Sequence, residues 1–229
     1  MEARAAVYES EQVFERLDRA AAEMFRTGRP DSYVGLRHDV ESAASRRPLT
    51  PDEKFALAVS ILSAGQHLRD PTDAEAAQSS LIEAASVDQS WWLPRLRLAE
   101  LYWDLGRLKE CLAACGTLPR FEVMDGFSPL DRFYVLQGEE FALSCRIRLF
   151  DPDLWEGELC RLAKHVGGYG IADVSLTDLG RTLDGFLAEH PRRSPRLVSC
   201  VRALAEADPT GHWDVRLYRE PPREPRHAD

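Results

Sequence analysis

The chain contains no long uncharged apolar run, so no segment approaches the ~18 apolar residues that a membrane-spanning helix requires. Residues 1–4 lead into a charged helical pattern rather than an apolar stretch, so no secretory signal is expected either. Lysine is nearly absent as well: only Lys54, Lys109 and Lys164 stand among the 29 basic residues. This arginine bias, together with abundant alanine and leucine, suggests a high-GC bacterial genome.

Positive charge is in deficit overall, because the net charge at pH 7 is -9. We therefore expect no direct binding to nucleic acid and no attraction to an anionic membrane surface. Cysteines are few and odd in number, with five scattered through helical segments. That usage predicts reduced, partly buried thiols and a cytoplasmic location. Cys111 and Cys115 lie one helical turn apart, but their positions are those of core residues rather than metal ligands.

Strand-like alternation is almost missing, whereas apolar residues recur at the three- and four-residue spacing of helices. Residues 50–53 (Thr-Pro-Asp-Glu) form a strong helix start, with a capping threonine, proline in the first turn and a capping-box glutamate. Helices are predicted over residues 8–26, 31–42, 50–68, 72–86, 91–105, 107–116, 130–150, 152–166, 176–190 and 195–207.

No linker divides the chain convincingly, so a single helical domain is predicted over residues 1–210. We expect it to comprise an N-terminal helical hairpin (1–48), two repeats (50–125) and degenerate helical pairs (128–209). Residues 211–229 are predicted to form an extended and partly disordered tail, because three prolines and many charges follow a short strand-like alternation.

A repeated motif appears in the middle of the chain. Leu98-Ala99, Tyr102, Gly106, Leu108 and Cys111 are spaced as in the tetratricopeptide family, which the segment resembles. Moving back by the family's period of about 34 residues places Ala64-Gly65, Leu68, Thr72, Ala74 and Ala77 in the same slots. Gly65 is expected inside a helix that crosses its neighbour closely. Weaker copies extend to about residue 209.

The resemblance implies an all-α fold, a right-handed superhelix of stacked antiparallel helix hairpins, with a concave groove that holds a peptide. By resemblance, residues of each first helix face that groove, including Val59 and Leu62. The partner-binding residues expected there are Gln66, Arg69, Asp70, Leu96, Glu100, Trp103 and Asp104. Trp103 is the most suitable anchor because a large aromatic side chain can dominate an interface; packing beneath a neighbouring helix remains the alternative. The family's basic clamp for a carboxylate tail is not reproduced.

Catalytic signatures are also missing. The sequence has no phosphate-binding loop, no nucleophile elbow and no metal-binding His-Glu-x-x-His spacing. We therefore expect no cofactor and no metal. The function we expect is that of an adaptor that binds a protein or peptide, and a second copy of the chain is left open as that partner. A helical enzyme or small-molecule-binding protein with a pocket between helices is the alternative, motivated by His67, Glu100 and His165 in apolar surroundings. A regulatory domain acting on a DNA-binding partner is a second alternative.

Overall fold

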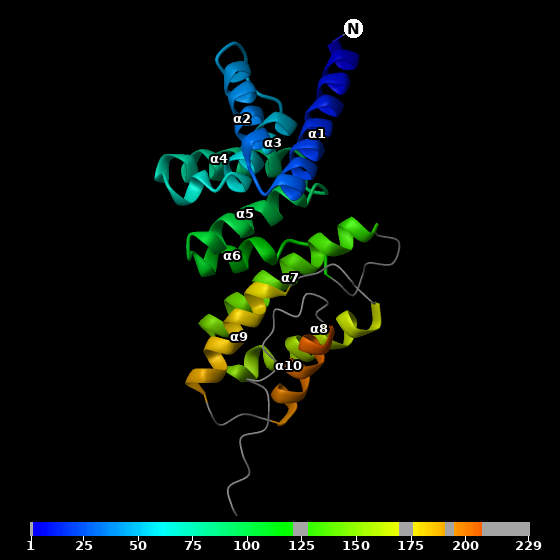
Figure 1. The fold of residues 1–229 in the computed structure, drawn as a ribbon, viewed down its shortest axis with the longest axis vertical. Coiled ribbons are helices and arrows are strands. Elements are labelled where there is room, and N and C mark those ends of the chain that lie inside the picture. The colour runs from blue at the N-terminus through cyan, green and yellow to red at the C-terminus, as the bar shows by residue number, and fades with distance from the viewer. Residues whose placement is uncertain (1, 121–127, 170–175, 191–194, 208–229) are drawn as a thin grey trace, which may run out of the picture. The chain divides into compact units, whose positions relative to one another are not determined.

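The computed structural model describes residues 2–120, 128–169, 176–190 and 195–207 (Figure 1). Within these ranges the regular structure is entirely helical, which confirms the predicted all-α class. The chain forms two compact units, Met1–Leu118 and Pro119–Asp229, where the sequence had predicted one uninterrupted domain. The tail over residues 211–229, with its predicted strand-like alternation, lies outside the described residues. No helix in the described ranges combines the length and the apolar character needed to cross a membrane.

The first unit consists of helices that pack on one another in sequence order. Within this unit each of the helices α1 to α5 contacts the helix that follows it, and α3 also contacts both α1 and α5. The elements are α1 (Glu2–Thr27), α2 (Asp31–Ala44), α3 (Pro51–Ser63), the 3-10 turn η1 (Gln66–Leu68), α4 (Pro71–Val87), α5 (Leu93–Asp104) and α6 (Leu108–Cys115). Short turns between consecutive helices make these contacts local in sequence.

The core of this unit is aliphatic, with an aromatic cluster on one side. Phe55 of α3 packs on Trp91, with ring centroids 5.0 Å apart, and Phe14 of α1 lies 6.3 Å from both rings. Ile61, Leu81 and other side chains of α3 and α4 are fully buried beside this cluster. The aromatic contacts therefore join α1 and α3 to the turn that precedes α5.

The helix starts show where local sequence decides the structure. Thr50 accepts the backbone N–H of Glu53, and the Glu53 carboxylate accepts the Thr50 N–H in return, so the predicted capping box at α3 is confirmed. Helix α5 begins at Leu93, later than the predicted start at residue 91, and no side chain caps it, Ser90 included. Ser90 instead donates to Asp88 in the preceding turn.

Gly65 has a different role from the one expected. It does not lie inside a helix at a close crossing: α3 ends at Ser63, and a Cβ built on Gly65 would meet nothing within 4 Å. Its φ of 64° is left-handed, a conformation that glycine adopts without steric cost. Gly28 and Gly106 have the same left-handed conformation after α1 and α5. Gly65 therefore ends α3 earlier than the predicted boundary at residue 68.

In the second unit, helices pack on the next helix but one. Helix α7 contacts α9, and α8 contacts α10 as well as the short turn η3. This pairing differs from the hairpins of consecutive helices expected over residues 128–209. The elements are α7 (Pro129–Leu149), η3 (Pro152–Leu154), α8 (Glu156–Tyr169), α9 (Thr177–Glu189) and α10 (Pro195–Ala207).

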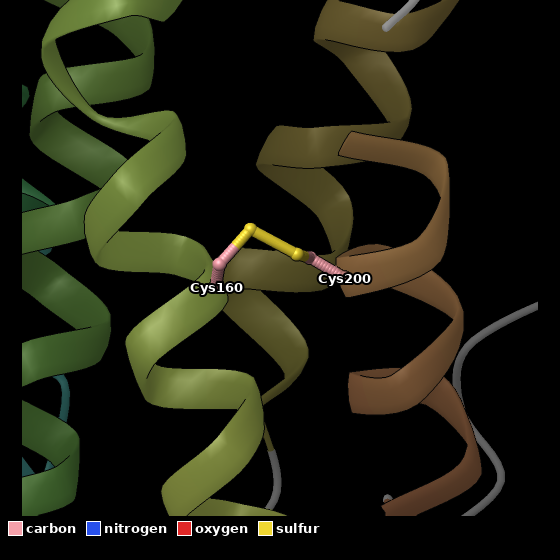
Figure 2. Close-up of a disulfide and its surroundings, with 2 residues drawn as sticks. All are labelled: Cys160 and Cys200. Atoms are coloured by element: carbon pink, nitrogen blue, oxygen red, sulfur yellow. A yellow bond between two sulfur atoms is a disulfide. The ribbon is translucent and has the colours of Figure 1, made fainter. Parts of the chain in front are cut away.

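A disulfide joins the second of these helix pairs (Figure 2). Cys160 of α8 and Cys200 of α10 lie 40 residues apart in sequence, with Cα atoms 5.1 Å apart. The expectation of reduced thiols was wrong for these two residues, because their bond depends on a helix packing that cysteine spacing does not reveal. The other three, Cys111, Cys115 and Cys145, are buried. Structural disulfides are typical of oxidising compartments. The cytoplasmic location stays a prediction, and cysteine usage no longer supports it.

Candidate functional site

The residues predicted to bind a partner lie in the first unit, on η1, at the start of α4 and along α5. The structure gathers four of them, Gln66, Arg69, Asp70 and Asp104, on the two turns that follow α3 and α5. Arg69, Asp70 and Asp104 are exposed, and Gln66 is half-buried. Glu100 and Trp103 are half-buried on α5.

Leu96 does not fit the predicted role. Its side chain is fully buried in the core, so it is not presented to a partner, and the prediction for this residue was wrong. Val59 and Leu62, also expected to face a groove, are buried as well. The physical reason is that these apolar positions are used for packing between helices, where burial of a leucine stabilises the fold by about 1.5–3 kcal/mol.

A histidine–carboxylate bond joins the two turns. The Nε2 of His67, in η1, lies 2.9 Å from Oδ2 of Asp104, the last residue of α5. Because a carboxylate only accepts hydrogen bonds, Nε2 carries the proton and donates it. The imidazole is 4% exposed, and its Nδ1 has no hydrogen-bond partner among the residues that the structure describes. The sequence singled out His67 only as an ionisable residue in an apolar context, and its partner 37 residues away was not foreseen.

A second polar link fastens η1 and α4 to α2. Arg37 donates to both carboxylate oxygens of Asp73, at 2.6 and 3.0 Å, and to Oε1 of Gln66 at 2.6 Å. The Arg37 guanidinium holds the pKa of the Asp73 carboxyl below its usual value. Sequence analysis missed both Arg37 and Asp73, although Arg37 also pairs with Glu41 at the i,i+4 spacing that can be read from a helix.

These bonds leave some of the predicted residues with structural roles. Gln66 accepts from Arg37, and Asp70 caps α4 by accepting the Thr72 N–H at 2.8 Å. Glu100 accepts from Arg97 at 2.7 Å, within its own helix. Asp104 has such a role too, because it accepts from His67, but its side chain and that of Arg69 are exposed on the two turns.

We define the turn-end surface as Leu68, Arg69, Asp104 and Leu105. Leu68 is 62% exposed and Leu105 is 37% exposed. Each leucine directly follows one residue of the His67–Asp104 bond, so both lie on the turns that this bond joins. Two exposed leucines beside a cation and a carboxylate can supply apolar contact and orienting charge to a protein or peptide.

The described residues contain no group of three or more His, Cys, Asp or Glu side chains placed to bind a metal ion. Comparisons with protein-family models, with curated proteins and with solved structures found no match to the chain.

Proposed function

We propose that the chain is an interaction protein whose first unit binds a protein or peptide partner through the turn-end surface. The observation that carries this proposal is the His67–Asp104 bond, which fixes two turns bearing exposed leucines and opposite charges. A surface held in place before binding loses less conformational entropy when a partner docks. Large exposed side chains on fixed turns are therefore a reasonable binding site.

We further propose that α1–α6 form three stacked helix pairs of the tetratricopeptide type. The packing of each helix on its successor, with added contacts of α3 to α1 and α5, supports this arrangement. The left-handed glycines after α3 and α5 support helix pairs, because both occupy the turn between the helices of one pair. They lie 41 residues apart and not at the family's period of about 34, so Gly65 does not take the helical slot that the repeat register gave it. In such a stack each pair covers the apolar face of its neighbour, and one edge stays open for binding.

Site-specific photo-crosslinking in the source cell tests the function. A photoreactive amino acid replaces Leu68, Leu105 or, as a control, Ile82, which is 46% exposed on α4 outside the turn-end surface. We expect an adduct of the same mass from positions 68 and 105 and none from position 82. Arg69→Glu should reduce the yield of both adducts, because it reverses a charge that the turn-end surface presents to the partner.

The mass of the adduct identifies the kind of partner. An adduct at twice the mass of the chain indicates a second copy, whereas any other discrete mass indicates a different protein. Absence of adducts at both leucine positions, or equal labelling at all three positions, would show that the turn-end surface does not bind a partner.

A further inference from the structure

The second unit contains a pocket that the proposed function does not use. It has a volume of about 610 Å³ and is bounded by the last turn of α7, the segment that follows it and one face of α9. Pockets for small molecules in proteins commonly measure about 300–1,000 Å³. The size therefore suits a ligand with the dimensions of one or two aromatic rings.

One wall of the pocket is aromatic. The rings of Phe186 and His190 are stacked, with centroids 4.2 Å apart and planes 15° apart. Trp155, fully buried behind them, contacts Phe186 edge-on at 5.1 Å and donates its Nε1–H to the carbonyl oxygen of Phe150. Phe150 itself lines the pocket and is 45% exposed. Such a wall, fixed from behind, favours a flat apolar ligand because aromatic rings pack well on one another.

Two guanidinium groups stand at one end of the α9 wall. Thr182 donates its hydroxyl proton to the Asp178 carbonyl at 2.8 Å and accepts a hydrogen bond from Arg148 at 3.5 Å. Thr182 thus helps to position Arg148, whose planar guanidinium has five N–H donors and suits a carboxylate. Arg181, which also pairs with the Asp178 carboxylate at 3.7 Å, adds a second positive charge to the same part of the pocket lining.

Acceptor groups stand at the other end of that wall. Glu189 lies eight residues after Arg181 on α9, a separation of about 12 Å along the helix axis. His190 Nδ1 lies 3.0 Å from the Phe186 carbonyl, which can only accept, so Nδ1 carries the proton. In the neutral ring Nε2 is then an acceptor. Asp151, on the segment after α7, adds a second carboxylate to the lining.

Gly185 keeps the middle of this wall clear. It lies in the interior of α9, where glycine is among the least favourable residues. A Cβ built on Gly185 would meet nothing within 4 Å, so packing inside the protein does not require glycine here. The missing side chain leaves its volume to the pocket between the arginines and the acceptor groups.

We propose that this pocket binds a small aromatic carboxylic acid that carries an amine at the end opposite the carboxylate. Arg148 and Arg181 hold the carboxylate, the ring lies over Gly185 against Phe186, and the amine donates to Glu189 and its neighbours. Charge complementarity selects this class, since the α9 wall carries Arg181 beside Arg148 at one end and the Glu189 carboxylate at the other.

Ligand-detected NMR on the full chain tests the proposal with 4-(aminomethyl)benzoate as probe. We expect saturation transfer from the protein to this probe. Two analogues serve as controls: 4-(aminomethyl)benzamide lacks the carboxylate charge, and 4-methylbenzoate lacks the amine. Each should bind at least about tenfold more weakly than the probe, because each leaves the charged groups at one end of the lining unpaired. Arg148→Gln should weaken binding of the probe about tenfold or more, and 4-(aminomethyl)benzamide should be little affected by it.

Gly185→Leu is the sharpest variant: its Cβ would meet nothing within 4 Å, its side chain would occupy the pocket, and it should abolish binding. Gly35→Leu is its control, because Gly35 is also an exposed helical glycine whose Cβ would meet nothing within 4 Å, and it lies in α2. Circular dichroism confirms that both variants fold. The proposal is overturned if the probe gives no transfer at millimolar concentration, if the benzamide binds as well as the acid, or if Gly185→Leu still binds.

Discussion

Glu140 should make the second unit less stable as the pH rises from mildly acidic to neutral. Its carboxyl is 5% exposed on α7 and accepts backbone N–H groups of Asp178 and Leu179, at 2.9 and 3.0 Å, in the first turn of α9. Burial, aided by the nearby Asp178 carboxylate, raises the pKa of Glu140 from 4.5 to about 7 against the effect of those two N–H groups.

The sign and size follow from the proton balance. Between pH 4.5 and pH 7 the folded protein keeps a proton on Glu140 that the unfolded chain has already lost, so raising the pH favours unfolding. At about 1.4 kcal/mol for each pH unit, this window corresponds to about 3 kcal/mol of free energy of unfolding. The contribution is complete below pH 4.5 and is lost as the pH passes about 7.

Glu140→Gln removes the titration and keeps an oxygen that can accept both N–H groups. We expect the variant to match the parent near pH 4.5 and to exceed it in stability at pH 8, by up to about 3 kcal/mol. Urea unfolding followed by far-UV circular dichroism at several pH values measures the difference. Glu206→Gln, at an exposed carboxylate of α10, should change stability by no more than about 0.5 kcal/mol at any pH.

A Glu140→Gln variant that is less stable than the parent at pH 8 would refute this reasoning. Such a result would mean that the ionised carboxylate gains more from two backbone N–H groups and the α9 dipole than it loses by leaving water.

Three other expectations concern stability. Reduction of the disulfide between α8 and α10, which closes a loop of 40 residues, should cost about 4 kcal/mol by loop entropy; a melting temperature unchanged by dithiothreitol would contradict it. Asp104→Ala should cost about 1–3 kcal/mol in urea unfolding, because His67 is left buried without its acceptor, whereas Asp104→Asn should retain part of the bond. Gly65→Ala should lower the melting temperature and Gly35→Ala should raise it, since only Gly65 has a left-handed backbone; equal shifts would argue against that turn.

Local features of the fold could be predicted from the sequence, and contacts between distant residues could not. The Thr50 capping box was predictable because its partners lie within four residues. The end of α3 was missed because Gly65 could equally be a helical glycine or a left-handed one. The α7–α9 packing was not foreseen, because it brings Glu140 to an N–H group 38 residues away, which no local pattern encodes.

The candidate site shows the same division. The repeat resemblance placed Arg69 and Asp104 on first helices that face a groove; both are exposed, but they lie at the turn after η1 and at the end of α5. Leu96 was assigned to a surface because the repeat resemblance specifies helix positions but not which of them each chain buries. The Arg37–Asp73 pair lies 36 residues apart, so only the packing of α2 on its neighbours could reveal it.

The interleaved order of helices in the second unit affects how the chain acquires its structure during synthesis. In the first unit each helix meets its main partner as soon as the next one leaves the ribosome, since neighbours in sequence are neighbours in space. In the second, α8 must wait for α10, and the bond between Cys160 and Cys200 cannot form until residue 200 has emerged. Contacts of greater sequence separation form more slowly, so the newly made second half stays exposed to chaperones and proteases for longer than the first.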